Sequence, residues 1–216
     1  MRLLVLSMAA ILTIGLTSVF YTQLRLLDST QNRLSELEPS QIDIGFSQSM
    51  AIHHEQAITM AQLLLDGRPT ALTTLAKTIA GKQLLELGEM HGWLRIWQQG
   101  FFPASKDMVW LLMGAKALDE SMQKYLIDCG NSADGMPGLA SREQLQQLRL
   151  LEGRERDTLF LQLMLAHHEG GVPMARFAAE ESRLLAVRTV AANMVLDQSK
   201  EIQQMRTMLK ALDYSR

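Results

Sequence analysis

An internal repeat constrains the fold of this 216-residue chain more than any other feature of its sequence. The pattern Asp-x-x-Phe-x-x-x-Met-x-x-His-His-Glu begins at Asp43 and recurs, position for position, from Asp157. A second pattern, Gln-x-x-Glu-x-x-x-Met, follows each copy, first from Gln83 and then from Gln198, at an offset one residue larger. The chain therefore uses one structural unit twice, with a single insertion or deletion between the parts of that unit.

The repeated unit is predicted to be a helical hairpin. Apolar residues recur at spacings of three and four over residues 42–65 and 70–97, and residues 66–69 read Asp-Gly-Arg-Pro, a turn sequence. The second copy predicts a long helix over residues 141–180 and a last helix over 184–212, and no strand pattern competes with these helices. Two hairpins placed about a pseudo-twofold axis give an all-α four-helix bundle with a long crossover.

We divide the folded part at residues 41–212 into repeat one (41–98), a crossover (99–140) and repeat two (141–212). Within the crossover, residues 106–127 are predicted to form a third helix, whereas residues 129–138 are rich in Gly, Asn, Ser and Pro, which is typical of a loop. Ser141 and Gln144 have the spacing of a capping box and predict a helix start.

The N-terminal sequence predicts a membrane anchor. Residues 3–24 carry no charge and follow Arg2, and a run of this length can cross a bilayer as a helix. No small-x-small cleavage site follows the run, which favours an uncleaved anchor over a removed signal peptide. We therefore assign residues 1–25 to a single-pass transmembrane helix and 26–40 to a juxtamembrane spacer. The folded domain is expected at the cell membrane, facing the periplasm or exterior.

Charge and cysteine content exclude several classes of function. The formal net charge is -2, and Lys and Arg are scattered among Asp and Glu, so the chain lacks the basic stripe that nucleic acids require. The single cysteine, Cys129, excludes an internal disulfide framework and any CxxC metal or redox motif.

Polar residues interrupt the apolar faces of both predicted helices in each hairpin. Met50, His53 and Met60 follow one apolar stripe of the first helix, and Gln83 and Glu86 fall on the expected core face of the second. Counting back from the turn places His53 level with Gln83 and Met50 level with Glu86. Because buried polar groups require partners, we expect one polar half-site in each hairpin, and therefore two half-sites in the chain.

The residue types in these half-sites indicate a transition-metal site. Neutral imidazole binds first-row transition metals, thioether sulfur selects Cu(I), and a carboxylate bound to the second ring nitrogen fixes the ligand's tautomer. A copper ion, Cu(I) in particular, is therefore favoured. The candidate ligands are Met50, His53, His54, Met60, Met90, His91, Met164, His167, His168, Met174 and Met205. The candidate supporting residues are Gln83, Glu86, Gln198 and Glu201.

Two features of the sequence limit this interpretation. Adjacent histidines project about 100° apart on a helix, so only one member of each His-His pair can lie centrally in the seam between helices. In the second repeat, Pro173 frees the carbonyl of Glu169 and predicts a kink, which would separate His167 from Met174. Either the second half-site uses the bend, or it has lost metal binding.

Three classes of function are compatible with such a bundle. The favoured class is a copper-binding or copper-buffering protein. A metal-free scaffold or partner-binding bundle would use the same His, Gln and Glu side chains as a buried hydrogen-bond network, and methionines also fill ordinary cores. A ferritin-like di-metal oxidase is disfavoured, because it would need Glu-x-x-His pairs and the sequence contains none.

The duplicated Met-x-x-His-His-Glu pattern, with Met-Ala and Gln-x-x-Glu-x-x-x-Met downstream, resembles the bacterial domain of unknown function 305 family. The resemblance covers about residues 41–212 and includes Met136-Pro137-Gly138, which is similar to that family's lead-in to its second His-His helix. It implies a ferritin-like fold and a likeness to periplasmic copper-binding proteins. It also implies that the His and Met residues of the repeated pattern form the site.

Overall fold

The computed structural model describes residues 15–31, 37–132 and 135–214, and these ranges contain helices and loops but no strand. The predicted all-α class is confirmed for this part of the chain. From residue 39 on, the elements are α2 (Gln41–Leu64), α3 (Thr73–Ile96), the 3₁₀ helix η1 (Val109–Met113), α4 (Glu120–Asn131), α5 (Arg142–Leu150), α6 (Gly153–Glu181) and α7 (Leu185–Tyr214).

The chain separates into two compact units, residues 1–38 and 39–216. In the first unit, residues 15–31 are helical, and residues 1–14, which carry much of the predicted anchor, lie outside the described residues. Among the residues that are described, no helix combines the length and the apolar character needed to cross a membrane. The transmembrane anchor stays a prediction.

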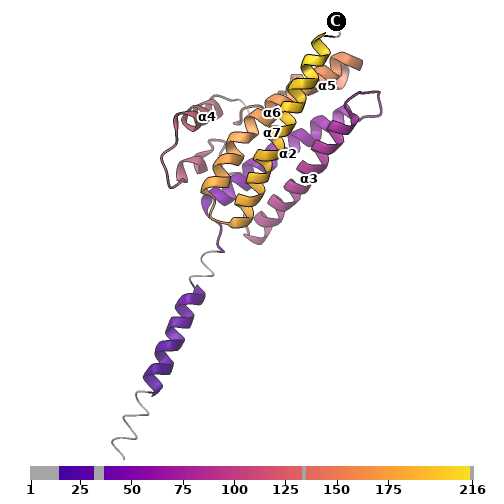
Figure 1. Cartoon of the computed structure of the whole chain (residues 1–216). Helices are drawn as coiled ribbons and strands as arrows, with labels where there is room; N and C mark the ends of the chain where they lie inside the picture. The colour runs from indigo at the N-terminus through magenta and orange to yellow at the C-terminus, as the bar shows by residue number, and fades with distance from the viewer. Residues whose placement is uncertain (1–14, 32–36, 133–134, 215–216) are drawn as a thin grey trace, which may run out of the picture. The chain divides into compact units, whose positions relative to one another are not determined.

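The second unit is built from the two predicted hairpins. Helix α3 packs on α2, α7 packs on α6, and the hairpins join through contacts between α2 and α6. Figure 1 shows each hairpin as a pair of neighbouring helices, with α4 to one side. At the start of α2, the Ser40 side chain accepts the Asp43 amide and the Asp43 carboxylate accepts the Ser40 amide. This capping box satisfies backbone donors that the first turn leaves free.

Helices α2 and α6 run antiparallel across each other, as two apolar clusters show. Phe46 near the start of α2 lies in one cluster with Phe177 near the end of α6. Leu64 at the end of α2 lies in the other cluster with Phe160 near the start of α6. The two helices cross between the clusters, and a pseudo-twofold axis at the crossing point relates the two repeats.

The aspartates of the repeated pattern join the two hairpins. The Asp43 carboxylate accepts the backbone amides of Arg183, at 3.3 Å, and Leu184, at 3.1 Å, in the α6–α7 turn. The equivalent Asp157 accepts the Thr70 hydroxyl at 2.6 Å and the Ala71 amide at 3.0 Å in the α2–α3 turn. Each aspartate therefore ties the N-terminal part of the first helix of one hairpin to the connecting turn of the other, a structural role that explains its repetition.

The predicted helix over residues 106–127 is wrong. That stretch contains the short η1, an extended Gly114, and α4, which begins only at Glu120. Two tertiary and local features override the helical pattern. The Trp110 ring packs edge-on against Phe46 of α2, and the Asp119 carboxylate accepts the Met122 amide at 2.8 Å and starts a new helix.

The predicted single helix over residues 141–180 is also wrong, because α5 ends at Leu150 and α6 begins at Gly153. Arg68, from the turn of the other hairpin, donates to the carbonyls of Leu151 at 2.9 Å and Arg149 at 2.8 Å. These bonds satisfy the carbonyls at the end of α5, and Gly153 takes the left-handed backbone conformation that redirects the chain, with φ of 54°. The capping box of Ser141 is present as predicted.

Candidate metal centre

Four histidines meet where α2 crosses α6. His53, His54, His167 and His168 are all fully buried, with 0% exposure. The His53 and His167 rings, one from each repeat, lie with centroids 3.7 Å apart and an interplanar angle of 35°. The Nε2–H of His167 donates to the carbonyl oxygen of His53 at 2.7 Å. We refer to these four residues as the histidine layer.

A carboxylate from the partner helix holds one histidine of each pair. His54 Nε2 lies 2.6 Å from Glu86 Oε2, and His168 Nε2 lies 2.8 Å from Glu201 Oε2. A carboxylate accepts a hydrogen bond, so Nε2 of each ring donates to it, and Nδ1 is the ring nitrogen left to bind a metal. The sequence had placed Glu86 level with Met50. Its actual partner is His54, the histidine that projects from the flank of the seam.

Many polar atoms of this layer have no hydrogen-bond partner among the described residues. They are Nδ1 of His54, His167 and His168, and both ring nitrogens of His53. The amide oxygens and nitrogens of Gln83 and Gln198, two more buried side chains, also lack partners. Buried polar atoms are rarely left unpaired, because each costs about 1–3 kcal/mol. Such a concentration is typical of a site that receives a ligand.

A glycine opens space beside His53. A Cβ atom on Gly171 would lie 2.8 Å from His53 Cε1, closer than such contacts permit, and 3.1 Å from Gln198 Oε1, a tight contact. The equivalent position in repeat one is Ala57, which carries a Cβ. Gly171 is not among the site residues predicted from the sequence. The exchange of alanine for glycine between the repeats was the signal that could have identified it.

Burial keeps the two central rings neutral. Loss of hydration lowers the pKa of His53 well below its ordinary value of 6.5, and the nearby His167 lowers it further. Burial lowers the pKa of His167 in the same way, with His168 as the next contribution. At neutral pH both rings are therefore uncharged and hold a nitrogen lone pair, which is the form that binds a metal.

The predicted division into two half-sites, one inside each hairpin, is wrong. Antiparallel packing of α2 on α6 brings both His-His pairs to the crossing point, where they form one layer. The six candidate methionines are fully buried on its two sides. Met50, Met90 and Met174 belong to one apolar cluster, and Met60, Met164 and Met205 belong to the other. Each cluster combines methionines from both repeats. Met50 and Met60, which share one stripe of α2, lie in different clusters.

The structure also places His91 and Pro173. His91 is partly buried and stacks on Phe101, with centroids 4.6 Å apart, so it lies apart from the four clustered histidines. Helix α6 runs without interruption through Pro173, and both His167 and Met174 remain fully buried. Tyr125 donates to the carbonyl of Gly170 at 2.9 Å, three residues before the proline.

The residues present suit a soft metal with few ligands. Within the described ranges, no group of three or more His, Cys, Asp or Glu side chains is arranged to hold an ion. A metal would therefore combine imidazole nitrogens with an amide oxygen or a thioether. Imidazole and thioether donors suit copper, and Cu(I) in particular among first-row ions. The unpartnered ring nitrogens and the space at Gly171 fit this requirement.

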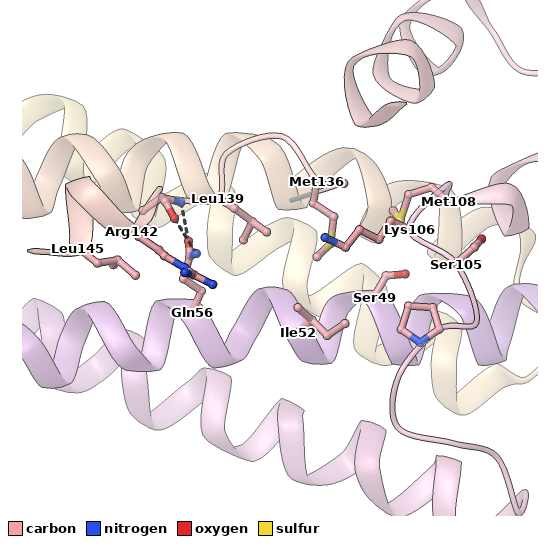
Figure 2. A pocket seen from close by; sticks show the side chains of 13 residues that line it. Ser49, Ile52, Gln56, Ser105, Lys106, Met108, Met136, Leu139, Arg142 and Leu145 are labelled. Atoms are coloured by element: carbon pink, nitrogen blue, oxygen red, sulfur yellow. Dashed lines mark hydrogen bonds between the residues drawn. The ribbon is translucent and has the colours of Figure 1, made fainter. Parts of the chain in front are cut away.

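A separate cavity lies between α2 and the crossover. It has a volume of about 330 Å³, and Figure 2 shows Ile52, Met136 and Leu139 among the side chains that line it. The Gln56 side chain also lines it, with its Nε2 donating to the Ala140 carbonyl at 3.0 Å and its Oε1 accepting the Ala140 amide at 2.6 Å. None of the candidate metal ligands lines this cavity.

Solved structures share this fold. A DUF305 protein from Streptomyces coelicolor is 30% identical, with a TM-score of 0.67, and the match covers 80% of this chain and 94% of that one. A DUF305 fragment from Deinococcus radiodurans is 23% identical, with a TM-score of 0.59, over 80% of this chain and 98% of that one.

CopM is also similar. Its Cu(II)-bound form is 24% identical, with a TM-score of 0.56, over 78% of this chain and 96% of that one. Its Cu(I)-bound form matches with a TM-score of 0.54 at the same identity and coverage. No curated protein matches the chain. Residues 43–209 match the family described as domain of unknown function DUF305, so the chain is a member of the DUF305 family.

Proposed function

We propose that this protein binds copper in the histidine layer and serves to bind or buffer the ion, with Cu(I) as the preferred form. The observation that carries this proposal is the set of fully buried histidines whose ring nitrogens lack partners. The likeness to CopM, a protein solved with Cu(II) and with Cu(I), supports it.

The proposed ligands follow from the free lone pairs. Since no three of these side chains are arranged around one ion, each ion would take at most two of the four rings. His53 and His167 offer neutral imidazoles, and His54 and His168 are the alternative donors through Nδ1, while their Nε2 atoms contact Glu86 and Glu201. Backing by a carboxylate orients a ligand and raises its basicity. Buried methionines on both sides of the layer offer thioethers, and we propose that these give the site its preference for Cu(I).

We also propose that the folded domain is held at the outer face of a membrane by residues 1–25. The support for this location is the charge-free run of residues 3–24. When cells that produce the full chain are fractionated, the protein should be recovered with the membranes and should resist extraction by high salt. Recovery of a soluble form that begins near residues 20–30 would contradict the anchor.

Competition titration tests copper binding. Purified protein and a chromogenic Cu(I) chelator would compete for the ion without oxygen, using the His53→Gln/His167→Gln double variant and the wild type. We expect the double variant to lose about tenfold or more in affinity. The matched control is His91→Gln, which changes a histidine outside the layer. Equal affinities in wild type and double variant would contradict the assigned site.

A second titration tests the role of the thioethers. Met50 and Met174 lie in the same cluster, so both are replaced by leucine, a change that nearly preserves volume. If sulfur binds the ion, Cu(I) affinity should fall much more than Zn(II) affinity, because thioethers are weak ligands for zinc. An equal change for both metals would identify these methionines as core residues only.

A metal-free scaffold is the second candidate. The contacts of His54 with Glu86 and of His168 with Glu201 favour it, since they join helices of each hairpin without any metal. Under this function the purified protein would retain no metal, and the histidine variants would lower stability alone.

A further inference from the structure

The repeat is broken beside the two carboxylates of the site. Lys82 precedes Gln83 on α3, and the equivalent residue on α7 is Asp197, which precedes Gln198. Equivalent positions of the two hairpins therefore carry opposite charges. No other part of the candidate site shows such a reversal between the repeats, because His53, His54, Gln83 and Glu86 are all matched in kind.

Lys82 reaches from its own hairpin to the other. Its Nζ lies 3.2 Å from Asp197 Oδ2 and 3.3 Å from Glu201 Oε1 on α7. Lys82 is also one turn before Glu86 on α3, but its ammonium is directed to α7 and forms no ion pair with Glu86. Both oxygens of Glu201 are thereby occupied, Oε1 by Lys82 and Oε2 by His168.

Glu86 differs from Glu201 in this respect. Among the described residues, its carboxylate makes one polar contact, from Oε2 to His54 Nε2, and Oε1 is free. Its side chain is 17% exposed, against 10% for Glu201. The two equivalent carboxylates therefore differ: Oε1 is free in Glu86, whereas Lys82 occupies Oε1 of Glu201.

These carboxylates are more exposed than the histidines and glutamines of the candidate site. The four histidines are fully buried, and apolar clusters bound the layer on both sides along the bundle. An ion that crossed either cluster would lose its hydration with only uncharged thioether sulfurs to replace it, and it would meet no anionic ligand among the residues of the cluster, which is unfavourable. A route past Glu86 or Glu201 offers an anionic ligand at the boundary between solvent and the buried rings.

We propose that copper enters and leaves the histidine layer by way of Glu86 and His54, and that Lys82 closes the equivalent route by way of Glu201 and His168. The proposal rests on the proposed copper-binding function and adds the direction of exchange. Glu86 Oε1 accepts the incoming cation, which then passes to the ring nitrogens. Lys82 acts through Glu201: it occupies the oxygen that would receive the ion and repels a cation that approaches.

Exchange rates test the role of Lys82. The full-length protein would take Cu(I) from a chromogenic chelator in a stopped-flow instrument without oxygen, at low and high salt. Lys82→Gln should raise the rate by about twofold, because two equivalent routes replace one, and the gain should shrink at high salt. Lys82→Arg keeps the charge and should restore the wild-type rate. Lys77→Gln removes the same charge from an exposed position of α3 and should leave the rate unchanged.

A charge exchange between the repeats tests the direction of entry. In the wild-type background, both Glu86→Gln and Glu201→Gln should weaken equilibrium Cu(I) affinity, because each removes the carboxylate behind a proposed ligand, but Glu86→Gln should slow uptake by about tenfold more than Glu201→Gln does. The Lys82→Asp/Asp197→Lys double variant moves the lysine to α7 of the other hairpin, where its ammonium should reach Glu86. The sensitivity should then be exchanged, with Glu201→Gln slowing uptake more than Glu86→Gln does.

The outcomes separate the two proposals. If the wild type binds no Cu(I) in the equilibrium titration, the proposed function fails and the entry route fails with it. If it binds Cu(I) but Glu86→Gln and Glu201→Gln slow uptake equally, copper binding stands and the single entry route is overturned. An unchanged pattern of sensitivity after the charge exchange would also overturn it, because Lys82 would not determine the route.

Discussion

Replacing Gly171 by alanine tests whether His53 is held in place by its surroundings. Two effects oppose each other at this helical position. Alanine is favoured over glycine in a helix interior by about 1 kcal/mol. Against this, the new Cβ would lie 2.8 Å from Cε1 of His53, whose ring already packs against the tilted ring of His167 with centroids 3.7 Å apart. Overpacking of a buried site typically costs about 1–3 kcal/mol.

The ring of His53 has little room to move away from the added methyl group, so the cost of overpacking should exceed the gain in helix propensity. We expect Gly171→Ala to lower the free energy of unfolding by about 1–2 kcal/mol, measured by urea denaturation of the metal-free protein. Gly88→Ala is the matched control, because this exposed helical glycine has no atom within 4 Å of the added Cβ. It should raise stability by up to about 1 kcal/mol.

The same pair of variants reports on the site. Displacement of His53 by Gly171→Ala should also weaken Cu(I) binding, whereas Gly88→Ala should leave it unchanged. If both variants gain stability by similar amounts, the ring of His53 is free to move, and the argument for a preformed space beside it is refuted.

Three further predictions concern stability of the metal-free protein. Burial lowers the pKa values of His53 and His167, so below pH 6.5 these histidines bind protons in the unfolded chain but not in the folded protein. The free energy of unfolding should therefore fall as pH falls, by about 1.4 kcal/mol per pH unit for each ring. In urea denaturation between pH 7 and 5, this dependence on pH should be weaker in His53→Gln than in the wild type. Asp157→Ala removes the acceptor of the Thr70 hydroxyl and the Ala71 amide and should cost about 1–3 kcal/mol in thermal or urea unfolding, with unchanged copper affinity. Tyr125→Phe removes one hydrogen bond to the Gly170 carbonyl and should cost about 1 kcal/mol, and a neutral effect would show that water replaces the hydroxyl.

Part of the candidate site was predictable because the same pattern of residues occurs twice in the chain. The spacing of His53, His54, Gln83 and Glu86, present twice, identified buried polar groups on helical faces without any knowledge of the fold. Their roles within the site were less predictable. A helical wheel places His53 on the seam and His54 on its flank, but it cannot say that the flanking ring meets Glu86 or that the central ring meets its counterpart from the other repeat.

The limits of helices were predictable where local signals decide them. Ser40 and Ser141 begin helices through their own side chains, and short-range capping is visible in the sequence. The break between α5 and α6 depends instead on Arg68, which is far away along the chain and satisfies the carbonyls at the end of α5. The irregular path around Trp110 depends in the same way on packing against α2.

The sequence by itself determined the helical class, the two hairpins and the set of side chains that must meet in the core, because periodicity and turn residues act over a few positions. Only the tertiary structure decided that the hairpins cross through α2 and α6, which merges two expected half-sites into one histidine layer and divides the methionines between two clusters. It also decided that Lys82 extends to Glu201 on the other hairpin and leaves Glu86 open. Contacts of this kind depend on the angle and register at which distant helices pack, and those are set by the whole core, which no local pattern records.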